Sequence, residues 1–258
     1  PGAPCRAEMN PPNPLPEVNI SEDGEVRFLH LGTEWIQGSM LLDSPFDIEL
    51  EYVQRMMAWL LFVEPDSVSQ RSALQLGLGS AALTKFSFKR LRMRTTAIEI
   101  NPQVVAVCRR WFKLPPDSAR LRVLQGDAGQ RIRDAEHQGR HDAVQVDLYD
   151  HEAAAPVLDS ADFYADCRRA LTDEGCLTVN LFGRDASYER SVQRLCEAFG
   201  EDAVWAFRPT REGNTVVLAQ RHASRPPRLE LLARAEAVQQ RWGLPAVKWM
   251  RLFKPVKA

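Results

Sequence analysis

Acidic residues and glycines stand at the ends of four apolar segments of this sequence. Gly77 and Gly79 follow the first segment, and Glu99 closes the second, 22 residues after Gly77. A glycine loop that opens a helix lets backbone approach a ligand at the positive helix N-terminus. A carboxylate at the next strand end can accept two hydrogen bonds from a ribose diol. The pair predicts a nucleoside site, whereas the alternative is a tight turn followed by a solvated acid.

The third and fourth segments also end in acids. Asp127 follows the third, where a carboxylate can accept the amino group of an adenine or cap the next helix. Asp147-Leu148-Tyr149-Asp150 closes the fourth, with capping of the following residues as the alternative. Open α/β sheets bind ligands outside the carboxyl ends of their strands. Four polar strand ends therefore favour a functional site over packing.

Strand-length apolar runs alternate with amphipathic segments, which predicts a parallel sheet with crossover helices. We expect strands over Ala73–Leu78, Thr95–Ile100, Leu121–Leu124, Ala143–Asp147 and Cys176–Leu181, then an antiparallel hairpin of Val204–Arg208 and Thr215–Gln220. We expect helices over Ala81–Arg90, Pro102–Phe112, Gly129–Ala135, Asp162–Leu171 and Ser187–Phe199. The predicted fold is α/β, a Rossmann-like sheet of the methyltransferase type with a small N-terminal β unit.

Composition divides the chain into four predicted parts. Residues 1–20 hold six closely spaced prolines and predict a disordered tail. Residues 21–65 predict the small β unit and a connecting helix over Ile48–Val63, and residues 66–222 the Rossmann-like domain. Residues 223–258 predict a basic helical extension, with a helix over Arg228–Trp242 that packs on the main domain or offers a surface to an anionic partner.

The charge balance excludes an obvious polyanion-binding protein. The chain has 33 Lys and Arg against 34 Asp and Glu, so nucleic acid is an unlikely partner. No apolar run is long enough to cross a membrane, and no signal-peptide pattern is seen, so we expect a cytoplasmic protein. The five cysteines are scattered and lack ligand spacing to histidine, so no metal site is expected.

Several motifs together carry a family resemblance. The run from Ala73 to Leu181 contains G-L-G-S, A-I-E-I-N-P-Q-V-V, W-F-K-L-P, R-L-R-V-L-Q-G-D-A, H-D-A-V-Q-V-D-L-Y-D and L-T-V-N-L. This run resembles the spermidine synthase (polyamine aminopropyltransferase) superfamily. Upstream, Ile36-Gln37 and the segment around Gln54 are similar to that family's V-I-Q hairpin and Y-Q-E-M helix.

The resemblance implies transfer of an aminopropyl group from decarboxylated S-adenosylmethionine to a small amine such as putrescine. Asp147 corresponds to the carboxylate that takes the proton of the attacking amine, and Asp150 to one that holds the cationic acceptor. The donor would lie against Gln37, Gly77, Gly79, Ser80, Glu99, Asp127 and Ala128. The acceptor would lie against Gln54, Tyr149 and Asp150. A homodimer is a possible assembly.

The sequence also departs from the family's pattern. Ser80 stands where the family's glycine loop has an aspartate that binds the donor's amine, Val53 replaces a tyrosine, and His151 replaces a proline. With the loop aspartate absent, Asp43, Asp47 or Asp150 are the sequence candidates for the donor's ammonium. Two alternatives therefore stay open: a methyltransferase that uses intact S-adenosylmethionine, and a non-catalytic nucleoside-binding homologue.

Overall fold

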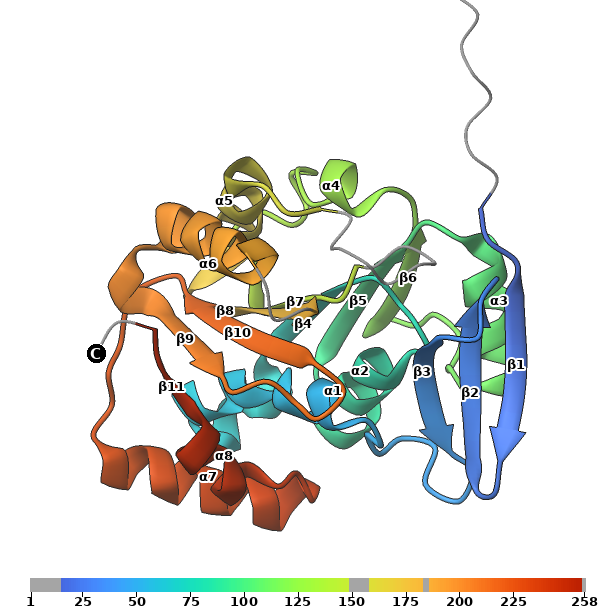
Figure 1. The fold of residues 1–258 in the computed structure, drawn as a ribbon, viewed down its shortest axis with the longest axis horizontal. Coiled ribbons are helices and arrows are strands. Elements are labelled where there is room, and N and C mark those ends of the chain that lie inside the picture. The colour runs from blue at the N-terminus through green and yellow to red at the C-terminus, as the bar shows by residue number, and fades with distance from the viewer. Residues whose placement is uncertain (1–14, 149–157, 183–185, 257–258) are drawn as a thin grey trace, which may run out of the picture.

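A large, mostly parallel sheet forms the centre of the computed structural model, which describes residues 15–148, 158–182 and 186–256. Eight strands of the described chain pair in the order β11-β9-β10-β8-β7-β4-β5-β6 (Figure 1). The strands are β4 (Ser72–Leu76), β5 (Arg94–Glu99), β6 (Leu121–Gln125), β7 (His141–Val146), β8 (Leu171–Phe182), β9 (Val204–Phe207), β10 (Asn214–Gln220) and β11 (Phe253–Pro255). The pairs among β4 to β8 are parallel, and those of β9 to β11 are antiparallel. The predicted fold class is confirmed.

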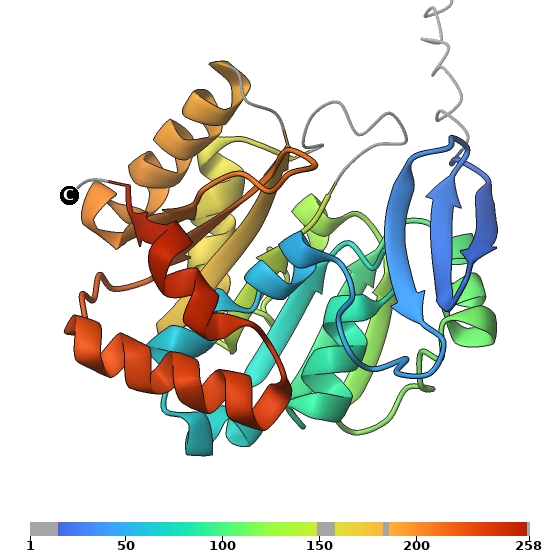
Figure 2. The ribbon, with the colours of Figure 1, turned by 60° about the horizontal axis from the view of Figure 1, so that its bottom comes forward.

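Helices cover both faces of this sheet, as the apolar residues of its central strands require. One face packs against α4 (Ala128–Arg131), α5 (Ala161–Ala170) and α6 (Ala186–Phe199). The other packs against α2 (Ala82–Lys85), α7 (Arg228–Trp242), α8 (Ala246–Leu252) and a 3₁₀ helix, Ala58–Phe62. Figures 1 and 2 show these two layers on opposite sides of the sheet.

The strand order reverses at β4. The chain runs outward from β4 through β5 to β6, and then returns to place β7 on the other side of β4. The carboxyl ends of β4 and β7 therefore flank a crevice, because the connections leave these two strands in opposite directions. Gly77 and Asp147 are the residues that follow the two strands.

A second sheet of three antiparallel strands lies beside the first one (Figure 2). It contains β1 (Val18–Asp23), β2 (Val26–Leu31) and β3 (Ile36–Leu41), and it shares a buried cluster with α3 (Pro102–Trp111). The small N-terminal β unit is therefore present. Its first strand begins within the range expected for the disordered tail, because Val18 and Ile20 pack against that buried cluster.

The single helix expected over Ile48–Val63 is wrong. The structure has a short α1 (Glu51–Arg55), followed by the separate 3₁₀ helix. The carbonyl of Met56 accepts hydrogen bonds from two buried side chains of the sheet, Gln145 (3.0 Å) and Thr178 (3.1 Å). These bonds hold the Met56 carbonyl toward the sheet, which favours a break in the helix at this point.

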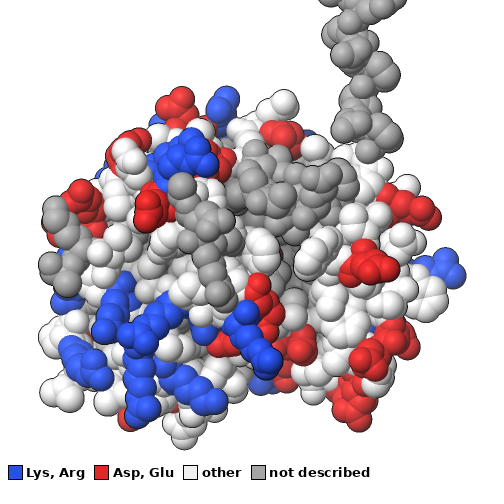
Figure 3. Space-filling view, in the orientation of Figure 1, with Lys and Arg blue, Asp and Glu red and all other residues white. Residues whose placement is uncertain are grey.

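The C-terminal segment contains the expected helix, α7, with the predicted bounds. The chain then adds α8 and a strand that sequence patterns did not predict, β11, which pairs with β9. Lys and Arg gather on the surface in this part of the molecule (Figure 3), and Lys248, Arg251 and Lys254 are among the exposed ones.

Within the described residues, no helix has the length and apolar character needed to cross a membrane.

A buried histidine pair lies at the end of the sheet opposite to the crevice. His141 begins β7, and its Nε2 is 3.1 Å from Nδ1 of His137, while its Nδ1 is 3.0 Å from the Ser72 hydroxyl. Between the two facing ring nitrogens, one must donate and the other accept, so full protonation of both rings would break the contact. Burial lowers the pKa of His141 to about 3 and also lowers that of His137.

We expect the free energy of unfolding to fall on acidification because of this pair. In the unfolded chain, His141 takes up a proton near its ordinary pKa of 6.5, whereas in the folded protein it does so only near pH 3. The free energy of unfolding therefore falls as the pH falls below 6.5. At 1.36 kcal/mol per pH unit, His141 contributes a loss of about 2 kcal/mol between pH 6.5 and 5. Urea unfolding at several pH values should show a shallower decline in His141→Asn. The surface variant His222→Asn should keep the wild-type slope, and an equal slope in His141→Asn would refute the assignment.

Candidate active site

A cavity of about 760 Å³ lies where the strand ends of the large sheet face the small N-terminal sheet. Seven of the residues expected at the site line it: Gln37, Gly77, Gly79, Glu99, Asp127, Ala128 and Asp147. Two others, Ser80 and Gln54, do not line it. Tyr149 and Asp150 lie outside the described residues. The structure thus brings together residues from five separate segments of the sequence.

Gly77 allows the carboxyl ends of β4 and β7 to approach each other closely. Its φ is +90°, and a Cβ atom placed on it would lie 2.3 Å from the carbonyl oxygen of Asp147. No side chain fits in that space, because real Cβ contacts of this length are not found. Glycine at this position therefore brings the loop after β4 against the end of β7.

Glu99 is fixed at the end of β5 by the glycine loop beside it. Its Oε2 accepts from the backbone N–H of Leu78 at 2.9 Å, and its Oε1 accepts from that of Asn101 at 2.8 Å. Burial raises the pKa of Glu99, and these backbone donors oppose the rise. A third backbone N–H, that of Ile100, also acts on this carboxylate. Its two oxygens have about four lone-pair sites in all, so Glu99 can still accept a hydrogen bond from a hydroxyl group in the cavity.

Asp127 caps α4 and also lines the cavity. Its Oδ1 accepts from the backbone N–H of Gln130 at 2.8 Å, which is the N-cap geometry. The capping alternative is therefore seen in the structure, and it uses only one of the two carboxylate oxygens. Within the described residues no hydrogen bond uses Asp127 Oδ2, so this oxygen can accept from a donor group such as an amine.

Asp147 has the environment of a proton acceptor. Its carboxylate lies at the end of β7, and removal from water raises its pKa. Asn180 Nδ2 donates to Oδ1 at 2.9 Å, and the Tyr52 hydroxyl donates to Oδ2 at 3.1 Å; both bonds oppose the rise. Asn214 in turn donates to Asn180 at 3.1 Å. This chain of hydrogen bonds orients the carboxylate, and a raised pKa makes it a better base near neutral pH.

Tyr52 and Asn180 are site residues that sequence reasoning did not select. Asn180 is a polar residue inside the apolar run of β8, and such an isolated amide is a signal that a buried partner exists. Tyr52 stands next to the position where the family has its tyrosine. Because α1 is short and its preceding residues are extended, Tyr52 reaches the cavity while Val53 is buried in the core.

The structure places Ser80 and Gln54 away from the cavity. The Ser80 hydroxyl donates to the carbonyl oxygen of Ser39 in β3 at 2.9 Å, and the side chain is buried against Gly38. Gln54 Nε2 donates to the carbonyl oxygen of Ile48 at 2.8 Å. Both side chains therefore hold the N-terminal sheet and its connection in place. By contrast, Gln37 lines the cavity, and its buried Nε2 has no hydrogen-bond partner in the described structure.

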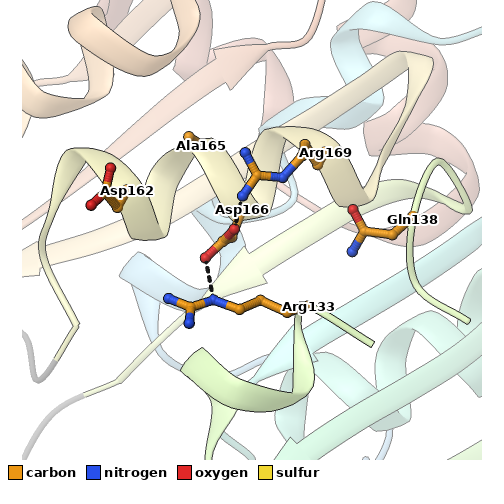
Figure 4. Close-up of a pocket in the computed structure, with 6 residues that line it drawn as sticks. All are labelled: Arg133, Gln138, Asp162, Ala165, Asp166 and Arg169. Atoms are coloured by element: carbon orange, nitrogen blue, oxygen red, sulfur yellow. Dashed lines mark hydrogen bonds and ion pairs between the residues drawn. The ribbon is translucent and has the colours of Figure 1, made fainter. Parts of the chain in front are cut away.

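Two other clusters of polar side chains lie outside this cavity. Figure 4 shows a smaller hollow, of about 410 Å³, whose lining includes Arg133, Asp162, Asp166 and Arg169; the Asp166 carboxylate is already paired with both guanidinium groups. Asp134, Glu136 and His137 place three possible metal-ligand atoms within 4.8 Å of one another. However, Asp134 pairs with Arg131, and Glu136 with Arg122. The carboxylates of Asp134, Glu136 and Asp166 are thus already paired with arginines.

Comparisons with known proteins are consistent across sequence and structure. No protein-family model matches the chain. The chain is 35% identical to a polyamine aminopropyltransferase of Neisseria meningitidis over 232 residues, which cover 89% of this chain and 86% of that protein. It is also 35% identical to a polyamine aminopropyltransferase of Chromobacterium violaceum over 242 residues, 93% of this chain and 90% of that protein.

A solved structure shares the fold. A probable spermidine synthase from Corynebacterium glutamicum superimposes with a TM-score of 0.68 at 17% identity, covering 91% of this chain and 88% of that one. The Neisseria and Chromobacterium relatives match about nine tenths of the chain at 35% identity. This protein is therefore a member of the polyamine aminopropyltransferase family.

Proposed function

We propose that this protein transfers the aminopropyl group of decarboxylated S-adenosylmethionine to a primary amine such as putrescine. The observation that carries the proposal is the pair formed by Glu99 and Asp147 in one cavity. Glu99 is placed to hold a nucleoside, and Asp147 is a fixed carboxylate with a raised pKa. Membership of the polyamine aminopropyltransferase family agrees with both roles.

The reaction is a displacement at the carbon next to a sulfonium. A bond forms between the amine nitrogen and that carbon, the carbon–sulfur bond breaks, and methylthioadenosine leaves with the electron pair. The attacking amine must be unprotonated, and after attack it carries one proton too many. Asp147 accepts that proton, with Tyr52 and Asn180 holding its carboxylate in one orientation. Placing both reactants in one cavity supplies much of the remaining acceleration.

The cavity has the groups that an adenosyl donor needs. Glu99 accepts from the ribose hydroxyls, and the free oxygen of Asp127 accepts from the adenine amino group. Gly77, Gly79 and Ala128 leave room for backbone contact. Gln37 contributes an unsatisfied Nε2, which a bound ligand would supply with an acceptor. By the family match, Tyr149 and Asp150, which lie outside the described residues, complete the acceptor site; Gln54, which the match also assigns to it, does not line the cavity. A homodimer and a cytoplasmic location stay predictions.

The direct test is product formation by the purified protein. Incubation with putrescine and decarboxylated S-adenosylmethionine should give the aminopropylated amine and methylthioadenosine in equal amounts, measured by mass spectrometry. A panel of other primary amines would identify the preferred acceptor. No turnover with any amine, in a protein that binds methylthioadenosine, would refute the proposed function.

Ser80 is the one observation that favours a second candidate, methyl transfer from intact S-adenosylmethionine. A serine in the glycine loop has no charge that would repel the methionine carboxylate. Calorimetric titration with the intact and the decarboxylated donor separates the two functions. A methyltransferase would bind the intact donor more tightly and yield S-adenosylhomocysteine, whereas an aminopropyltransferase would show the opposite preference.

We expect Glu99→Ala to weaken the binding of methylthioadenosine by about 1.5 to 3 kcal/mol, the usual contribution of hydrogen bonds to a charged group. The loss should depend on the ribose diol. In calorimetric titrations, the wild type should therefore prefer methylthioadenosine over its 2′-deoxy analogue, and the variant should not distinguish them. A variant that stays folded and keeps the preference would remove Glu99 from the ribose site.

A further inference from the structure

An aminopropyl donor presents a problem that the described glycine loop does not solve. The donor ends in an ammonium group, and a cation taken out of bulk water into a cavity requires an anionic partner. The loop from Gly77 to Ser80 contains no acid, and Ser80 donates its hydroxyl to the Ser39 carbonyl instead of facing the cavity. Of the three acids suggested by sequence proximity, Asp150 lies outside the described residues, and the other two do not fill this role. Asp43 and Asp47 do not line the cavity, and Asp47 is paired with Arg90 at 2.9 Å.

The cavity itself offers other carboxylates beyond Glu99, Asp127 and Asp147. They are Glu34, Glu49, Glu51 and Glu212. Glu34 and Glu212 are exposed, and the carboxylate of Glu51 is held at 2.5 Å by the buried guanidinium of Arg55. Glu49 differs from these three because it is partly buried and none of the described cations pairs with it. Among these four, Glu49 therefore combines partial shielding from water with a charge that no described cation neutralises.

Hydrogen bonds through one residue, Ser39, connect Glu49 to the glycine loop. The Ser39 hydroxyl donates to Glu49 Oε2 at 2.6 Å, and the Ser39 carbonyl accepts from Ser80 at 2.9 Å. Ser39 is itself buried in β3, which packs so closely on the loop that a Cβ atom on Gly38 would lie 2.6 Å from the Ser80 hydroxyl oxygen. A carboxylate from the segment before α1 is thus fixed one residue, Ser39, away from the loop position that has no charge.

We propose that Glu49 binds the terminal ammonium of the aminopropyl donor and thereby selects the decarboxylated donor over the intact one. The inference rests on the proposed function. Intact S-adenosylmethionine carries a carboxylate next to its ammonium, and Glu49 would repel that carboxylate. One side chain therefore attracts the decarboxylated donor and disfavours the intact one. Ser39 acts as a positioning residue that holds the Glu49 carboxylate.

The experiment measures binding of three ligands to Glu49→Gln by calorimetry. Affinity for decarboxylated S-adenosylmethionine should fall roughly 10- to 100-fold, the range expected for a charge-assisted hydrogen bond. Affinity for methylthioadenosine, which lacks the ammonium, should stay within about twofold, and the preference for the decarboxylated over the intact donor should shrink. Ser39→Ala should give a smaller loss with the same ligand pattern. Glu25→Gln, in the exposed turn between β1 and β2, removes the same charge outside the cavity and should change none of the three affinities.

Three results would overturn the proposal. Unchanged affinity for the decarboxylated donor would remove Glu49 from the donor site. An equal loss for methylthioadenosine would make Glu49 a structural residue. An increased KM for the amine with unchanged donor affinity would place it at the acceptor instead. Product formation by the wild type is measured separately, so the proposed function can stand when this inference fails.

Discussion

Asp147→Asn is expected to lower kcat by about 100-fold or more while leaving the affinity for methylthioadenosine within about threefold. The amide has the shape of the carboxylate but lacks its basic lone pairs. It can also keep its neighbours, because its oxygen can face Asn180 and its amino group can donate to the Tyr52 hydroxyl. The effect should therefore appear in the chemical step, measured as product formed per second at saturating donor and amine.

Tyr52→Phe is the companion variant for this assignment. It leaves the carboxylate in place and removes one hydrogen bond that lowers the pKa of Asp147. The pKa of Asp147 should then be higher than in the wild type, and the acidic limb of the pH–rate profile should move to higher pH. A near wild-type rate in Asp147→Asn, or an unshifted acidic limb in Tyr52→Phe, would contradict a role for Asp147 as the base.

The part of the site that could be predicted from the sequence is the part that the sheet determines. Glu99 ends a strand of the large sheet, and Gly77, Asp127 and Asp147 follow three other parallel strands of that sheet. The carboxyl ends of parallel strands share an edge. Their convergence on one cavity follows from the alternation of strands and helices alone. The ligand each one binds was proposed from the family resemblance and stays a prediction.

Side-chain direction in the connecting segments could not be predicted in the same way. Ser80 belongs to the matched glycine loop, yet its hydroxyl faces β3, because the contact between Gly38 and the loop is formed by residues far apart in the sequence. Tyr52 reaches Asp147 because the helix around it is interrupted at Met56 by side chains from β7 and β8. Such long-range contacts leave no local pattern in the sequence.

The second large effect is expected at Gly77. Gly77→Ala should lower the free energy of unfolding by about 3 to 5 kcal/mol, because the new methyl group would overlap the Asp147 carbonyl and the φ of +90° is itself strained for alanine. Relief of the overlap requires the end of β4 to move away from the end of β7. The folded variant should then bind methylthioadenosine at least tenfold more weakly, since Glu99 is held by the backbone of the same loop.

Gly200 provides a matched control for this prediction. Its φ is also +90°, but a Cβ atom added there would meet nothing within 4 Å. Gly200→Ala should therefore show only the cost of the backbone conformation, about 1 to 2 kcal/mol, with unchanged ligand affinity. The difference between the two variants in urea-induced unfolding measures the close approach of the two strand ends. Equal losses of stability, with the ligand affinity of Gly77→Ala unaffected, would show that this approach is not needed to build the site.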